Sequence, residues 1–145
     1  MDHAELVAFV QRHPTASIAT VGSDGRPRSA MVEVAITEAA EIIFDTSVRD
    51  RDYQNILVSP QVAFVIGGDD SVTVQSEGIA DVLTGADLDR CLRVFFQQCP
   101  AGRGRARDPD IVHIRIRPRW VRLDDHRPES YGTQEIQLDP PSASL

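Results

Sequence analysis

The sequence contains no lysine, so all 15 of its cationic side chains are arginines. This absence excludes Schiff-base lysines, lysine general bases and the Walker A phosphate loop, because each of them needs an ammonium group that arginine does not supply. Phosphate binding is not excluded, since a guanidinium group donates two parallel hydrogen bonds to phosphate oxygens. A phosphate-containing ligand is therefore compatible with this composition.

Cysteine is scarce as well, with only Cys91 and Cys99 in the chain. On one helix these residues would lie about 12 Å apart along the axis, which is too far for a disulfide bond. The four histidines are scattered, and no Cys-x-x-Cys or His-x-His spacing concentrates metal ligands. We therefore predict neither a disulfide between the two cysteines nor a metal site.

Long apolar runs are also absent, since none approaches the roughly 18 to 20 residues of a membrane span, and the N-terminus lacks the basic segment of a signal peptide. The formal net charge of −7 disfavours nucleic-acid binding. The arginines in residues 103–107 are interpreted as a solvated loop. A chain of 145 residues fits one domain. We expect a cytoplasmic protein that binds neither membranes nor nucleic acid.

Apolar runs and alternation predict six strands in antiparallel order. The strands are expected at Ala16–Val21, Pro27–Ile36, Glu41–Thr46, Val62–Ile66, Ser71–Leu83 and Ile111–Leu123. Helical spacing is found in Glu5–Arg12 and Ala86–Cys99, and Tyr53–Val58 is interpreted as a third, short helix. The fold class is therefore α+β and mostly β, with a small barrel or curled sheet and flanking helices.

Three local features refine this prediction. The pair Asp24-Gly25 suits the positive φ angles of a tight hairpin turn. Gly78 indicates a bulge in the fifth strand. Asp50 or Ser47 is expected to cap the short helix, because either side chain accepts a hydrogen bond from a free backbone N–H group.

The last 18 residues differ in composition from the rest. Residues 128–145 are polar and contain Pro140-Pro141, which predicts a flexible tail after a domain of residues 1–127. A short strand at Glu135–Leu138 stays open as an alternative, if a partner covers it.

Several segments, taken in order, resemble the pyridoxamine 5'-phosphate oxidase-like family of split barrels that bind flavin mononucleotide (FMN). The resemblance covers roughly residues 1–127. The segments that carry it are Ala19–Pro27, Phe44–Ser47 with Arg51 and Asn55, Ser59–Ala63, Gly78–Leu83 and Arg117–Val121. It implies a six-stranded antiparallel split β-barrel with flanking helices, and a homodimer with two FMN sites at its interface.

The resemblance also implies a set of cofactor-binding residues. They lie on the second strand, at the end of the third strand, around the following helix, and where a glutamine often hydrogen-bonds the flavin ring. The candidates are Ser29, Ala30, Met31 and Val32, then Thr46 and Ser47, then Arg49, Arg51 and Asn55, and finally Thr73. Two alternatives stay open: Arg49 and Arg51 form ordinary surface ion pairs, or Thr46 and Ser47 only cap the helix.

Two positions depart from the family pattern. The family's basic residue on the second strand falls at Ala30, and its lysine falls at Asp52. A phosphate would lose two cations and gain a nearby carboxylate, which Arg28, Arg49 and Arg51 would have to offset.

The implied function is a flavin-dependent oxidoreductase acting on a small molecule, with the chemistry supplied by FMN. Pyridoxamine phosphate oxidase activity itself is not expected, because the chain is short and lacks a counterpart of the oxidase's substrate-phosphate residues. No general acid or base is evident, so the catalytic residues stay unassigned, and His113 is placed on an exposed strand face. The alternatives are a cofactor-free dimeric binding or stress module, and a deazaflavin-dependent reductase.

Overall fold

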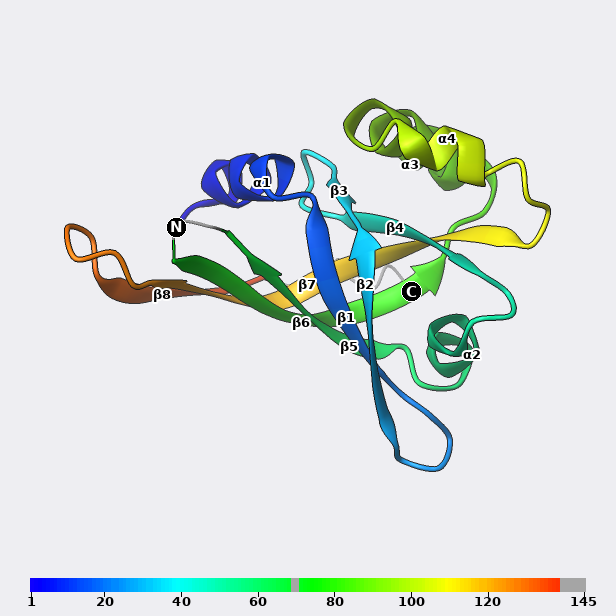
Figure 1. The fold of residues 1–145 in the computed structure, drawn as a ribbon, viewed down its shortest axis with the longest axis horizontal. Helices are drawn as coiled ribbons and strands as arrows, with labels where there is room; N and C mark the ends of the chain where they lie inside the picture. Colours follow the sequence, from blue (N-terminus) through cyan, green and yellow to red (C-terminus); the bar gives the residue numbers. More distant parts are fainter. Residues whose placement is uncertain (69–70, 139–145) are drawn as a thin grey trace, which may run out of the picture.

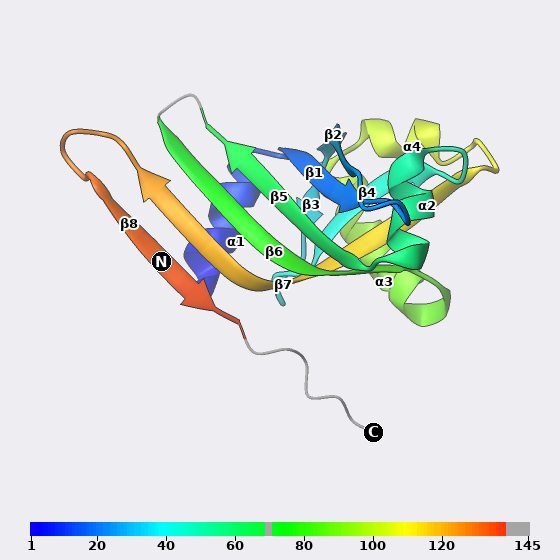
Figure 2. The same ribbon diagram turned by 90° about the horizontal axis from the view of Figure 1, so that it is seen from below.

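A computed structural model describes residues 1–68 and 71–138 of the chain. It contains one antiparallel sheet of eight strands in the order β2-β1-β5-β6-β7-β4-β3, with β8 paired to β7 (Figure 1). The strands are β1 Thr15–Val21, β2 Pro27–Glu33, β3 Ala35–Ile36, β4 Ile42–Ser47, β5 Gln61–Gly67, β6 Val72–Val82, β7 Ile111–Asp125 and β8 Gly132–Gln137. The sheet is strongly curled, as Figure 2 shows. The mostly β, antiparallel split-barrel fold with flanking helices is confirmed.

Four helices accompany the sheet in the described part of the chain: α1 His3–Arg12, α2 Arg51–Val58, α3 Gly85–Gln98 and α4 Ala101–Arg105. Asp2 and Glu5 form a reciprocal capping box at the start of α1, which fixes where that helix begins. Figure 1 shows α1, α3 and α4 along one side of the sheet and α2 beside the β1–β2 hairpin. No described helix has both the length and the apolar composition that crossing a membrane requires.

The predicted number of six strands is wrong, because the described chain forms eight. One predicted strand is divided into two, and one strand lies in the predicted tail. The predicted strand Pro27–Ile36 divides at Val34, whose N–H donates to the Pro14 carbonyl at 2.8 Å. Its first part pairs with β1 and its second part with β4, so this segment passes from one edge of the sheet to the other.

The second added strand is β8, which pairs with residues 120–125 of β7. It includes most of the predicted short strand Glu135–Leu138 and lies within the predicted tail. The remainder of that tail, residues 139–145 with Pro140-Pro141, lies outside the described residues.

The predicted turn and bulge are both present. The hairpin loop runs from Gly22 to Arg26, and within the Asp24-Gly25 pair only Gly25 has a positive φ, of 78°. The ladder between β6 and β7 shifts register between Glu77 and Gly78. A Cβ atom at Gly78 would lie 2.6 Å from the Arg117 carbonyl oxygen, so only glycine fits there without a rearrangement.

Two apolar clusters form the core. The larger fills the concave side of the sheet beneath α1 and includes Phe9, Phe44 and Phe64. The smaller lies under α3 and contains Phe95 together with both cysteines, which are buried and unpaired. Burial raises the pKa of the Cys99 thiol to about 11, so this side chain is a packing residue rather than a nucleophile.

Candidate functional site

Strand β2 is unusual because the five residues Pro27–Met31 are exposed on both faces of the strand. Met31 alone is 69% exposed. The strand pairs only with β1, so its other edge has no strand partner in the described chain. A strand of a globular sheet normally buries at least one face, so the exposure of β2 on both faces is a departure from the usual pattern.

A cavity of about 370 Å³ lies beside this strand, between the β1–β2 hairpin and the N-terminus of α2. It brings together three of the predicted residues, Ser29, Ala30 and Arg51. Five further residues line it: Ile18, Thr20, Arg28, Asp50 and Asp52.

Three arginines near this cavity differ in their surroundings. Arg28 and Arg51 both line it, and the side chain of neither forms a hydrogen bond or ion pair within the described chain. Arg49 is 83% exposed, and its Nε lies 2.9 Å from Asp110 Oδ2. Arg49 therefore lies in a surface ion pair, whereas Arg28 and Arg51 line the cavity without a carboxylate partner in the described chain.

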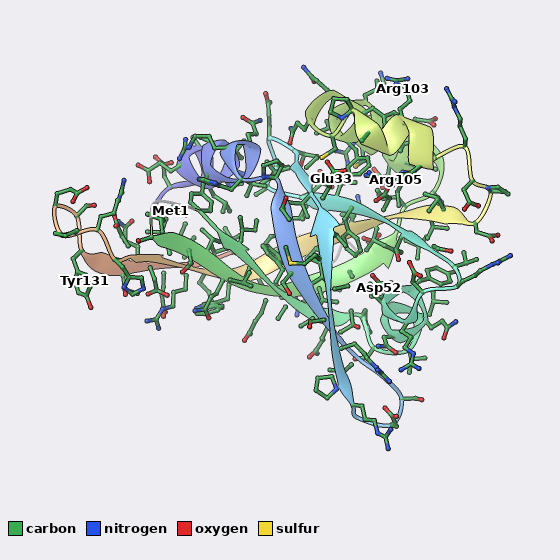
Figure 3. All side chains as sticks on the ribbon, in the orientation of Figure 1. Met1, Glu33, Asp52, Arg103, Arg105 and Tyr131 are labelled. Atoms are coloured by element: carbon green, nitrogen blue, oxygen red, sulfur yellow. The ribbon has the colours of Figure 1, made fainter. Side chains whose placement is uncertain are left out.

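The two carboxylates of the cavity are held by neighbouring donors. The Thr46 hydroxyl lies 2.7 Å from Asp52 Oδ1 and 3.1 Å from Asp50 Oδ2. Asp52 Oδ1 also accepts from the Tyr53 N–H, and Asp50 Oδ2 from the Ser47 N–H. Asp52 is only 9% exposed (Figure 3). Its carboxylate is thus turned toward β4 and stabilised at a helix N-terminus.

These contacts correct the predicted cap of α2. Asp50 occupies the N-cap position, but no side chain donates or accepts a capping hydrogen bond there. Its carboxylate instead closes the turn that follows β4. The Thr46 hydroxyl has only one proton, and two carboxylates compete for it, so this residue has no donor left for a ligand.

Of the remaining candidates, Asn55, Val32 and Ser47 make side-chain contacts within the chain, whereas the Met31 side chain is exposed. Asn55 Nδ2 donates to Thr20 Oγ1 at 3.0 Å and so holds α2 against β1. Val32 is half-buried and packs against the larger core cluster, whereas Met31 points into solvent. Ser47 Oγ accepts from the Arg49 N–H and stays within its own turn.

Thr73 lies away from the other candidates. It stands near the start of β6, opposite Gly67 of β5, whereas Ile18 of the cavity is level with Phe64 of β5 and Ser76 of β6. Thr73 therefore lies about 10 Å further along β6, and no β6 residue is among the described residues that line the cavity. Within one chain, Thr73 does not reach the cavity.

Arg28 is the residue to which sequence reasoning gave too little weight. It stands two positions before Ala30 on the same strand, and alternate residues of a strand share a face. A basic residue is therefore present on the expected face of β2, two positions before the expected one. Because alternate residues of a strand share a face, this spacing could have identified Arg28 from the sequence.

A second charged cluster lies at the other end of β2. Arg105 Nη1 lies 2.7 Å from Glu33 Oε1, and Arg105 Nε lies 2.7 Å from Asp45 Oδ2 (Figure 3). Glu33 ends β2 and Asp45 lies on β4, so one guanidinium joins the two strands across the opening of the barrel.

His113 is buried, which corrects its predicted place on an exposed strand face. The rings of Phe95 and Phe96 contact it edge-on, with centroids 5.6 and 6.1 Å away. This burial lowers the pKa of His113 and favours the neutral imidazole. The sequence shows the alternation of β7 but not that α3 covers this part of it.

Comparison with known proteins gives one family match. A family model described as pyridoxamine 5'-phosphate oxidase matches residues 2–124. No curated protein matches the chain.

Several solved structures share the fold. A heme-binding protein from Mycobacterium smegmatis superposes with a TM-score of 0.80 at 15% identity over 94% of this chain, which spans 58% of that protein. A conserved hypothetical protein from Mycobacterium tuberculosis gives a TM-score of 0.72 at 26% identity, covering 88% of this chain and 86% of the other. The heme storage protein HutZ from Vibrio cholerae gives 0.66 at 20% identity, covering 79% and 88%.

Proposed function

The chain belongs to the pyridoxamine 5'-phosphate oxidase family, and on that premise we propose that it is a homodimeric FMN-binding protein, a flavin-dependent oxidoreductase that acts on a small molecule. One observation carries the proposal: Arg28 and Arg51, whose side chains have no ion pair in the described chain, both line one cavity beside the exposed strand β2.

The residues of this cavity fit a phosphomonoester. Arg28 and Arg51 would hold the phosphate oxygens, and the Ser29 hydroxyl would donate to them. Asp50 and Asp52 oppose the phosphate charge, but both carboxylates already accept hydrogen bonds from within the turn.

Micromolar binding of FMN would need contacts to the flavin ring in addition to the two arginines. Charge-assisted hydrogen bonds contribute about 1.5–3 kcal/mol each. Micromolar affinity requires about 8 kcal/mol, so the two arginines supply part of it. The flavin ring, lying along β2 at Ala30–Val32, would supply the rest. When bound, FMN provides the hydride or electron transfer, and the chain provides position and shielding from water.

A second copy of the chain is the proposed cover for β2. Exposed apolar side chains lie on this part of the sheet, with Met31 on β2, Val21 on β1 and Val65 on β5. A flavin lying on β2 of one chain alone would be open to water on its other face. A homodimer would bury both the ring and these side chains.

Haem is the competing ligand, because two of the structural neighbours are described as heme-binding or heme storage proteins. Haem iron is held by an axial histidine, cysteine, methionine or tyrosine. None of these residue types is among the described residues that line the cavity, whereas two arginines are. The cavity therefore favours FMN over haem. A cofactor-free module and a deazaflavin reductase are not favoured.

Titration of the purified full-length protein with FMN, followed by quenching of flavin fluorescence, tests the proposal. Arg28→Gln and Arg51→Gln are expected to weaken binding about tenfold or more each, since each removes a charge-assisted contact. Arg49→Gln is the matched control, because Arg49 lies in the same turn but pairs with Asp110.

Two results would contradict the proposal. One is failure of the unmodified protein to bind FMN at tens of micromolar. The other is an Arg49→Gln variant that binds FMN as weakly as Arg51→Gln. A parallel titration with haem, read from its Soret band, identifies the ligand if FMN fails.

A further inference from the structure

A second cavity, of about 470 Å³, shares no lining residue with the candidate cofactor cavity. It is enclosed by the start of α1, the turn between β3 and β4, α3, β7 and the end of β8. Its apolar wall consists of Ala39, Ala40, Pro118 and Leu138. Its volume is within the range of small-molecule sites in proteins.

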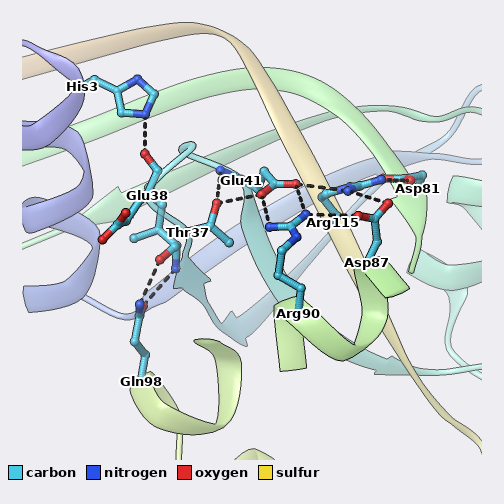
Figure 4. A network of polar contacts seen from close by, with 10 residues as sticks. His3, Thr37, Glu38, Glu41, Asp81, Asp87, Arg90, Gln98 and Arg115 are labelled. Atoms are coloured by element: carbon cyan, nitrogen blue, oxygen red, sulfur yellow. Dashed lines mark hydrogen bonds and ion pairs between the residues drawn. The ribbon is translucent and has the colours of Figure 1, made fainter. Parts of the chain in front are cut away.

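One wall of this cavity is a buried ion-pair network (Figure 4). The Glu41 carboxylate accepts from Arg90 Nη1 and Nη2 at 2.8 and 3.1 Å and from Arg115 Nη1 at 3.1 Å. It also accepts from the Thr37 hydroxyl at 2.9 Å. With four donors on its two oxygens, Glu41 has no acceptor site left for a ligand. The carboxylate therefore fixes the wall and does not bind a cation.

The network also fixes the charges around the cavity. Arg115 has a side chain only 6% exposed, and Asp81 holds it through two bonds of 3.0 and 2.7 Å. Asp87 lies 3.4 Å from Arg115 and 3.3 Å from Arg90. Both guanidinium groups are thus already paired with carboxylates. Neither provides an unpaired positive charge.

Arg117 is the group for which the described chain provides no counter-charge. It stands two residues after Arg115 on β7, so the two side chains leave the same face of the strand. It lines the cavity and is half-buried as a residue, and its side chain has neither an ion pair nor a hydrogen bond within the described chain. An anion in the cavity would give this guanidinium the counter-charge that the described residues do not provide.

The backbone that forms the cavity edge is strained. Ala40 has a φ of 63°, in the left-handed region that alanine rarely adopts, and it is buried. Hydrogen bonds between Thr37 and both Ala40 and Glu41 hold the turn closed. Strain of this kind is retained where the surrounding structure enforces it, most often at a ligand site.

From these observations we propose that this cavity is a second ligand site, which takes a small organic monocarboxylate with a short apolar body. Arg117 binds the carboxylate as a two-pronged donor, and the alanine, proline and leucine side chains contact the apolar part. A single negative charge matches Arg117, the one arginine without an ion pair among the described residues that line this cavity. A phosphate dianion would add a second negative charge close to Glu41 and Asp87, so it is disfavoured.

Isothermal titration of the full chain with 3-phenylpropanoate tests the site, with 3-phenylpropanamide and inorganic phosphate as the neutral and dianionic comparisons. Saturable binding of the carboxylate alone is expected. Arg117→Gln should weaken it about tenfold or more, because the charge-assisted pair is lost. Arg119→Gln is the matched control, since Arg119 is an exposed arginine of the same strand that lines a different cavity.

A second variant separates loss of binding from loss of folding in Arg117→Gln. Ala39 is exposed on the cavity rim, so Ala39→Trp should block the cavity while leaving the fold intact, as checked by circular dichroism. The proposal fails if 3-phenylpropanoate shows no saturable binding, if the amide or phosphate binds as tightly, or if Arg119→Gln weakens binding as much as Arg117→Gln. FMN titration of the same variants should be unchanged, which separates this site from the proposed cofactor site.

Discussion

The charged network around Glu41 can be tested by replacing that residue with glutamine. Glutamine keeps the shape of the side chain but removes the charge that pairs with Arg90 and Arg115. The hydrogen bonds from Arg90, together with those from Thr37 and Arg115, lower the pKa of Glu41 from its ordinary value of 4.5 to about 2, although burial acts in the opposite direction. The carboxylate side chain is 11% exposed, so solvent screens these contacts little.

The size of the effect follows from this pKa. One pKa unit corresponds to about 1.4 kcal/mol, so the difference between 4.5 and about 2 gives Glu41 roughly 3 kcal/mol of stabilising free energy at neutral pH. Because the folded-state pKa is depressed, this contribution is fully present above about pH 4.5 and is lost as the pH falls toward 2. By pH 3 it should be less than about half of its neutral value.

Urea denaturation of the unmodified protein and of Glu41→Gln at pH 7, 5, 4 and 3 would measure both quantities. The variant should lose about 2–3 kcal/mol at pH 7, and this difference should shrink below pH 4.5. Glu38→Gln is the control, because Glu38 is exposed and lies in the same turn. The reasoning is refuted if the two variants are equally stable at pH 7, or if the loss in Glu41→Gln is the same at pH 3 as at pH 7.

Two further predictions concern stability. Arg105→Met should lower the free energy of unfolding in urea by about 2–4 kcal/mol, because it leaves the buried Asp45 carboxylate without its cation. Arg103, which lies over the Phe96 ring, is the control, and Arg103→Met should cost less than about 1 kcal/mol. Equal losses in the two variants would exclude a bridging role for Arg105. Gly78→Ala should lower the free energy of unfolding in urea by about 1–3 kcal/mol, because its Cβ would meet the Arg117 carbonyl. Gly104→Ala, which has open space around the new Cβ, should be close to neutral, and a neutral Gly78→Ala would contradict the close approach.

Local features of the fold were predictable where one residue type decides the backbone. Gly25 takes the positive φ that the hairpin needs, and Gly78 marks the bulge. Periodicity likewise placed the main strands and helices. The division of Pro27–Ile36 at Val34 was not predictable, because it depends on a hydrogen bond to the Pro14 carbonyl that exists only after the barrel has curled.

The candidate site shows the same limit more sharply. The family resemblance named Ser29, Ala30 and Arg51 as candidates, and the fold brings these three residues to one cavity. The resemblance gave no side-chain directions, so it did not show that the Asp52 carboxylate turns toward Thr46 or that Arg49 turns toward Asp110. The sequence also did not show how β5 and β6 align with each other, and this alignment places Thr73 away from the cavity.

The position of Arg105 connects the stability of the barrel to the proposed cofactor strand. Strand β2 is covered on neither face over Pro27–Met31, so these residues contribute little buried apolar area to hold the strand in place. What fixes the strand is its ladder with β1 and, at its end, the ion pair from Glu33 to Arg105, which also holds Asp45 of β4. In the proposed FMN complex, part of the binding free energy would be spent on ordering this exposed strand. Because Arg105 holds the end of β2, Arg105→Met is expected to weaken FMN binding in the same fluorescence titration, although Arg105 does not line the cavity.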